Sequence, residues 1–69
     1  MNKYLVVVEK ANRNFAAYLP DVPGCVATGK TRDQVLDRIQ KAFAMHVAGM
    51  REDGLPLPEP VSSADYIRA

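Results

Sequence analysis

Two short runs of strand-forming residues open the chain. Residues 3–10, "KYLVVVEK", are rich in β-branched side chains, and residues 14–20, "NFAAYLP", form a second run that ends at a proline. The segment between them, "ANRN", has the polar residues typical of a turn. The pattern therefore predicts a β-hairpin.

A rigid corner follows the hairpin. In "PDVPG", Pro20 and Pro23 restrict the backbone and bias each preceding residue towards extended geometry, while Gly24 permits a left-handed conformation. Residues 25–29, "CVATG", are short and partly β-branched. We expect them to form a third strand.

The next segment carries the signals of an amphipathic helix. Thr31 and Gln34 have the spacing of a capping box, and Asp33 lies in the first turn, where the helix dipole favours a negative charge. Gly54, followed by Pro56, predicts a left-handed stop. Between these ends the apolar positions recur at helical spacing: Val35, Leu36, Ile39, Ala42, Phe43, Val47 and Met50.

The end of the chain is predicted to be extended. Residues 55–60, "LPLPEP", cannot continue a helix and should run as a polyproline-like connector. Residues 61–68, "VSSADYIR", alternate well enough for a last short strand. The order is then β-β-β-α-β, an α+β fold in which one helix crosses one face of a small antiparallel sheet. With 69 residues, we expect a single domain over 1–69.

The first strand is apolar on both sides. Tyr4, Val6 and Val8 point to one face of the predicted sheet, and Leu5 and Val7 point to the other. One helix can cover only one of these faces, so a partner protein or a second copy is needed for the other. A domain of this size has little core of its own, and association is a common reinforcement. We therefore predict a homo-oligomer, a dimer or tetramer, or a complex with another protein.

Composition narrows the classes of function. Nine basic and eight acidic residues give a net charge of +1, which argues against direct nucleic-acid binding and against a membrane-surface protein. No apolar window approaches the roughly 20 residues of a membrane span. A lone thiol without an export signal predicts a cytoplasmic location. One cysteine and one histidine supply no metal-ligand set, and we expect no cofactor.

The stretch "GCVATGKT" matches the pattern of a phosphate-binding loop, with Gly24, Lys30 and Thr31 in the required places. Such a loop must curl so that successive amides meet the phosphates, whereas "CVAT" suits an extended strand. Gly24 is also already used by the corner. We interpret the match as coincidental: a third strand runs into a capped helix.

Other reactive residues have simpler structural explanations. Cys25 has no local base, and His46 falls inside the apolar stripe of the helix, which indicates a packed or interfacial side chain. Glu9, Asp21 and Asp65 show no spacing that would bring them together at a metal. The sequence thus predicts no catalytic residue and no enzyme.

Taken together, the segments resemble the HicB-like antitoxin family. The resemblance is carried by "YLVVVE", "FAAYLPDVPGCVATGKT", the helix "RDQVLDRIQKAFAMHVAGMREDG" and "LPLPEP", and it covers nearly the whole chain. The resemblance implies a trimmed ribonuclease H-like fold without the acidic metal site. It also implies a non-catalytic antitoxin that packs against HicA, a small toxin that cleaves messenger RNA, and occludes it. Full-length members commonly add a carboxy-terminal helix-turn-helix or ribbon-helix-helix segment that binds operator DNA; since the sequence runs to Ala69, we expect a stand-alone relative without that segment.

Candidate partner contacts come from the strand and the corner. On the strand we select Tyr4, Val6 and Val8, or alternatively their opposite-face neighbours Leu5 and Val7. On the corner we select Asp21, Pro23 and Gly24, because a rigid exposed loop presents side chains at little entropic cost.

Two other functions stay open at this point. A self-associating regulatory or scaffold module would form a stable oligomer without a toxin. A residual nuclease or nucleotide hydrolase would show magnesium-dependent activity that Lys30→Ala or Asp65→Ala removes, and it is the less favoured of the two.

Overall fold

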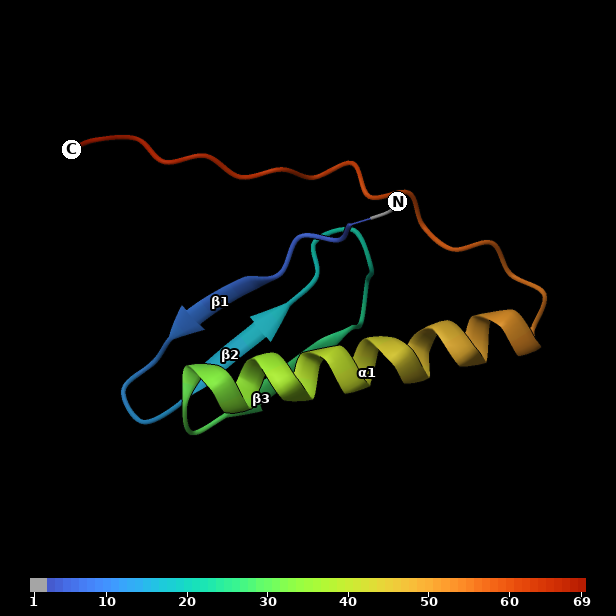
Figure 1. The fold of residues 1–69 in the computed structure, drawn as a ribbon, viewed down its shortest axis with the longest axis horizontal. Coiled ribbons are helices and arrows are strands. Elements are labelled where there is room, and N and C mark those ends of the chain that lie inside the picture. Colours follow the sequence, from blue (N-terminus) through green and yellow to red (C-terminus); the bar gives the residue numbers. More distant parts are fainter. Residues whose placement is uncertain (1–2) are drawn as a thin grey trace.

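The fold is a three-stranded sheet with one long helix. A computed structural model describes residues 3–69 and contains β1 (Val7–Lys10), β2 (Phe15–Tyr18), β3 (Val26–Gly29) and α1 (Arg32–Glu52). The strands are antiparallel neighbours in the order β1-β2-β3, and the helix lies over β2 and β3 (Figure 1). The predicted α+β class, the hairpin, the third strand and the helix are confirmed, although the first strand begins at Val7 and residues 3–6 precede it.

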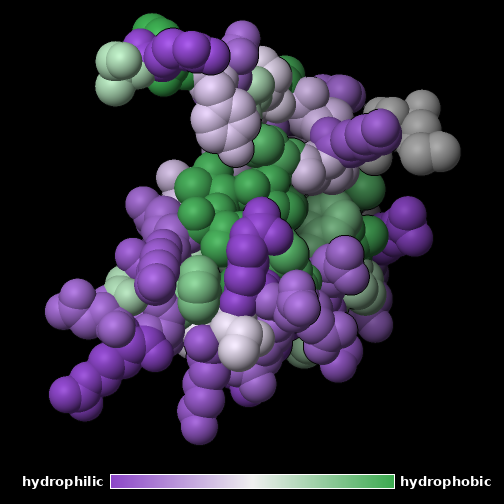
Figure 2. Space-filling model, turned by 60° about the vertical axis from the view of Figure 1, so that its left-hand side comes forward, coloured by the Kyte–Doolittle hydropathy of each residue, from purple (hydrophilic) through white to green (hydrophobic). Residues whose placement is uncertain are grey.

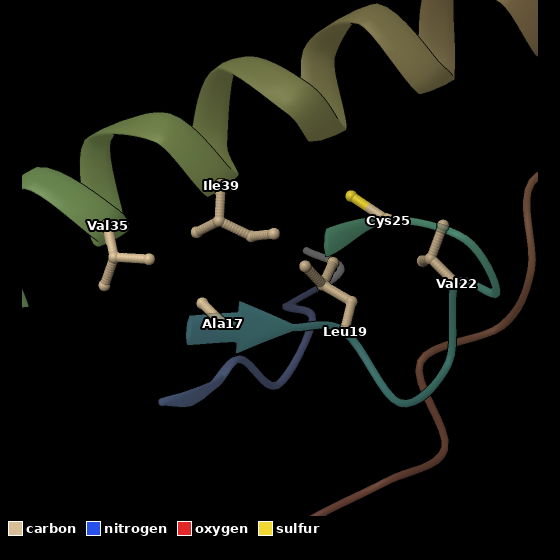
Figure 3. Packing of buried hydrophobic residues seen from close by; sticks show 6 residues of the cluster. All are labelled: Ala17, Leu19, Val22, Cys25, Val35 and Ile39. Carbon is tan, nitrogen blue, oxygen red and sulfur yellow. The ribbon is translucent and has the colours of Figure 1, made fainter. Parts of the chain in front are cut away.

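One side of the sheet packs against the helix. The register places Val8 opposite Ala17 and Ala17 opposite Ala27, so these three side chains share the helix-facing side. Two apolar side chains of the helix, Val35 and Ile39, are fully buried above this row. Figure 3 shows how the core gathers between β2, the corner and the helix; its buried members are Ala17, Leu19, Val22, Cys25, Val35 and Ile39.

The helix begins and ends where the sequence predicts. The Thr31 hydroxyl oxygen accepts a hydrogen bond from the Gln34 amide at 3.0 Å, as a capping box requires. The Gln34 side chain, however, accepts from the amide of Lys30 at 2.6 Å, one residue before the cap. Gly54 closes the helix with a φ of 67°. The second hydrogen bond of the capping box is therefore made to the residue before the N-cap and not to the N-cap itself. The predicted left-handed stop at Gly54 is confirmed.

The predicted last strand is wrong. Within the described part of the chain, residues 55–69 contain neither helix nor strand, and no backbone hydrogen bond joins residues 61–68 to the sheet. We call residues 55–69 the tail. Two contacts hold its first half: the Tyr4 hydroxyl donates to the Pro58 carbonyl oxygen at 2.6 Å, and Ser62 donates to the Asp21 carboxylate. These contacts fix the path of the tail without bringing its backbone into a ladder.

Candidate partner-binding surface

The side of the sheet away from the helix carries an uncovered apolar row. Val7 pairs with Tyr18, and Tyr18 pairs with Val26, so the three side chains lie next to one another across the strands. Their side is the one opposite the buried row, because neighbouring residues of a strand alternate. Tyr18 is 39% exposed and Val26 is 64% exposed. We call Val7, Tyr18 and Val26 the open row.

A more polar row borders the open row on the same side. Glu9 pairs with Ala16, and Ala16 pairs with Thr28. Glu9 and Thr28 are exposed. An apolar strip with polar neighbours is the usual composition of a protein-binding surface, since the polar groups keep the free protein soluble.

The strand residues selected from the sequence divide between the two sides. Tyr4, Val6 and Val8 are half-buried and pack against the core on the helix side. The Tyr4 ring lies with its centroid 5.0 Å from that of Phe43, tilted by 50°. Of the two alternatives that the sequence left open, the face of Val7 is therefore the one that the helix leaves uncovered.

The corner residues have two different roles. The Asp21 carboxylate accepts hydrogen bonds from the Ser62 hydroxyl at 2.7 Å and the Ser62 amide at 2.9 Å. The hydroxyl bond is the main cause that lowers the pKa of Asp21 below its ordinary value, because it stabilises the charged form. Pro23 and Gly24 are exposed, and Gly24 has a φ of 84°. Asp21 thus anchors the tail, while Pro23 and Gly24 face solvent.

The stretch "GCVATGKT" does not form a phosphate loop. Val26–Gly29 is strand β3, so its amides follow a ladder and do not converge on an anion. Gly29 is required for another reason: a Cβ there would lie 2.8 Å from the backbone nitrogen of Val35. This glycine allows the strand to approach the first turn of the helix closely.

The remaining reactive residues do not form a reaction centre. Burial raises the pKa of the Cys25 thiol, which keeps it protonated and poorly nucleophilic at neutral pH. His46 is half-buried on the helix. Among residues 3–69, no three side chains of His, Cys, Asp or Glu lie close enough together to share a metal ion. No helix in the described ranges is long and apolar enough to cross a bilayer.

Sequence reasoning did not select Tyr18 and Val26. Both were assigned to strands, yet their shared face with Val7 depends on the pairing register, which one strand pattern does not specify. Alternation around Ala17 could have found Tyr18, because Ala16 and Tyr18 must point away from the core if Ala17 points into it. Val26 then follows only from its pairing with Tyr18.

The chain matches one protein family and is similar to several known proteins. A family described as "HicB_like antitoxin of bacterial toxin-antitoxin system" matches residues 4–69. An uncharacterized 14.9 kDa protein from the rep-hol intergenic region of Haemophilus phage HP1 is 34% identical over 64 residues. That alignment covers 93% of this chain but 48% of the phage protein, so the chain spans about half the length of that relative.

Two further matches cover larger shares of the relatives. A UPF0150 protein of Helicobacter pylori is 31% identical over 49 residues, which are 71% of this chain and 68% of that protein. Among solved structures, a chain of a "HicA3 and HicB3 toxin-antitoxin complex" matches with a TM-score of 0.72 and 32% identity. This alignment covers 87% of the present chain and 70% of the solved one.

Proposed function

Since this chain belongs to the HicB-like antitoxin family, we propose that it binds a small HicA-type toxin and occludes the toxin's RNA-cleaving site. It acts by packing against the toxin and performs no chemical step itself. The match to a chain of a toxin-antitoxin complex supports a protein partner of this kind.

The observation that carries the proposal is the open row. Val7, Tyr18 and Val26 form an apolar strip on a sheet face that no helix or strand of residues 3–69 covers, and Tyr18 and Val26 are exposed on it. Gly24 and Pro23 lie two and three residues before Val26, so the exposed corner leads directly into this strip. A toxin seated here would bury the strip and contact the rigid corner at low entropic cost.

The helix-side residues have a secondary part in this proposal. Tyr4 and Val6, in the segment before β1, line an open hollow of about 230 Å³ together with Phe43 of the helix. A toxin segment that enters this hollow would contact Tyr4 and Val6. Contacts at Tyr4, Val6, Val8 and Asp21 stay predictions, and for Asp21 we propose an indirect role through the tail.

We also propose that the protein works in the cytoplasm and associates with itself. On this proposal, its sheet is a reduced form of a ribonuclease H-like sheet.

A second candidate function is a self-associating regulatory module without a toxin. The open row favours it equally, because a second copy would cover the same apolar side chains. The two candidates differ in whether a toxin co-purifies with the chain.

The experiment is co-expression with HicA-type proteins encoded in the source genome. We expect one of them to arrest growth alone, to be rescued by this chain, and to form a complex in which purified toxin no longer cleaves RNA. The chain without toxin should cleave no RNA in magnesium. If every such toxin keeps full RNA cleavage in the presence of excess chain, the antitoxin function is wrong.

A further inference from the structure

The sheet has two edges at which another chain could add a strand. The order β1-β2-β3 gives β1 and β3 one neighbouring strand each, so one side of each backbone is without a ladder. Such edges pair with strands of other chains unless a charge, a covering segment or a short length prevents it. What lies beside each edge therefore decides how the sheet can meet a partner.

The chain's own tail lies beside the β1 edge. Residues 64–66 face residues 5–8 across a hollow of about 420 Å³. The side chains of Tyr4 and Asp21 hold the preceding part of the tail through hydrogen bonds. Figure 2 shows the tail as a strip of chain at the top, with hydrophobic side chains gathered beneath it. A strand of another chain could reach β1 only by displacing this anchored segment.

The outer backbone groups of β3 belong to Val26 and Thr28. The Leu19 amide donates to the Cys25 carbonyl oxygen at 3.3 Å, so these two residues form a hydrogen-bonded pair of the β2–β3 ladder. Bonded and non-bonded pairs alternate along an antiparallel ladder. The amide and carbonyl groups of Val26 and Thr28 therefore point away from β2, towards the free side of β3.

A positive charge occupies this free side. Arg38, in the second turn of α1, donates from Nη1 to the Thr28 carbonyl oxygen at 3.0 Å. No acid of residues 3–69 forms a salt bridge with Arg38. The guanidinium therefore lies where the backbone amide of an added strand would have to donate to Thr28.

We propose that Arg38 blocks strand addition at the β3 edge. An added strand would have to displace the guanidinium from Thr28 and would then lie against a charged side chain. With the tail beside β1, both edges are closed to other chains, and the open row is the part of the sheet that stays accessible. A partner then contacts side chains of the open row and not unpaired backbone groups. This last consequence rests on the proposed function, whereas the role of Arg38 does not.

Replacement of Arg38 tests its role without any partner protein. We expect Arg38→Ala to form oligomers larger than those of the parent chain at protein concentrations about tenfold lower, measured by sedimentation. Lys41→Ala is the matched control, because it removes the same charge from an exposed position of the same helix and should leave the mass unchanged. If Arg38→Ala has the mass of the parent at every concentration, or if Lys41→Ala associates equally, the proposal is wrong.

A second substitution locates the new contact. Val26→Pro removes an amide that β2 does not use, and proline is tolerated at such edge positions. We expect Arg38→Ala/Val26→Pro to return to the mass of the parent. In Arg38→Ala alone, hydrogen exchange of the Val26 amide should slow by about tenfold as the protein concentration rises. If the double variant stays larger than the parent, or if exchange at Val26 is unaffected by association, the contact does not involve the β3 edge and the proposal is wrong.

The affinity for a toxin separates this inference from the proposed function. A toxin seated on the open row should bind Arg38→Ala within about twofold of its affinity for the parent, because it contacts side chains on the sheet face. A change of about tenfold or more would show that the toxin uses the β3 edge, and would overturn recognition by the face alone. If no toxin binds the parent chain, the proposed function is wrong, and the role of Arg38 is decided by the mass and exchange measurements.

Discussion

The two faces of the same three strands have opposite surroundings. On the helix side, Val8, Ala17 and Ala27 meet the buried side chains of α1. On the other side, Tyr18 and Val26 of the open row are exposed to solvent and Val7 is half-buried. Both rows are apolar. Each residue of one row is the sequence neighbour of a residue of the other row, so the two rows lie on opposite faces of the sheet. If the open row is the binding surface, as we propose, stability and binding are separated by face, and substitutions on the two faces should have different consequences.

The largest effect should come from the helix face. Ile39→Ala removes a side chain that is 1% exposed, and we expect a loss of about 2–5 kcal/mol in the free energy of unfolding, because the close-packed core cannot fill the cavity. Urea unfolding followed by circular dichroism measures this loss. Met45→Ala, on the exposed part of the same helix, should change stability by less than about 0.5 kcal/mol. Equal losses in both variants would contradict the assignment of the core.

Two glycines provide a matched comparison of close packing. Gly29→Ala places a Cβ at 2.8 Å from the Val35 backbone nitrogen, and we expect a loss of about 1–3 kcal/mol from the strain. Gly49→Ala adds the same methyl group within the helix, where no atom beyond the local helix backbone lies within 4 Å, and should stabilise by up to about 1 kcal/mol. Thermal unfolding of both variants gives the comparison. A stabilised Gly29→Ala variant would show that strand and helix do not approach closely.

The helix cap should contribute less than the core. Thr31→Ala removes the acceptor of the Gln34 amide hydrogen bond, and the expected loss of stability is about 1 kcal/mol. Thr28→Ala is the control, since Thr28 is exposed on β3 and caps no helix. Urea midpoints of the two variants measure the difference. If Thr28→Ala costs as much as Thr31→Ala, the cap is not the source of the effect.

The smallest effect should be the pH response of the tail anchor. The hydrogen bonds from Ser62 lower the pKa of Asp21, so the folded chain binds this proton less tightly than the unfolded chain does. The contribution of the anchor is therefore present above the ordinary aspartate pKa of about 4 and is lost as the pH falls through the lower, folded value. The amide resonance of Ser62 in NMR spectra should move over that acidic range. In the Asp21→Asn variant, the Ser62 amide resonance should stay constant over the same pH range. If it moves equally in both proteins, the hydrogen bond from Ser62 to Asp21 does not hold the tail.

The sequence predicted those parts of the fold that depend on local signals. Thr31, Gln34 and Gly54 mark the helix ends through short-range hydrogen bonds and backbone conformation, and the corner glycine at 24 has the expected left-handed φ. The last strand was wrong because a strand exists only when another backbone pairs with it. The alternation of apolar and polar residues in 61–68 indicates only a tendency to form a strand. It does not show whether the unpaired edge of a sheet lies close enough to pair with this segment.

The candidate site was predicted less completely for a similar reason. The sequence showed that Tyr4 and Val7 must lie on opposite faces, but only the position of the helix over β2 and β3 decides which face is covered. Asp21 was selected as an exposed corner residue, whereas its contact with Ser62 joins positions that are 41 residues apart. Contacts at such separations leave no local pattern in the sequence.

The most direct test of the account is the affinity of the toxin identified by co-expression for Val26→Asp. A carboxylate in the open row would be buried without a partner in the complex, and we expect binding to weaken by at least about 2 kcal/mol, or roughly thirtyfold. The urea midpoint of the free variant should stay near that of the parent, because Val26 is 64% exposed. Met45→Asp is the control and should bind as the parent does. Unchanged toxin affinity in a folded Val26→Asp variant would contradict the claim that the open row is the binding surface.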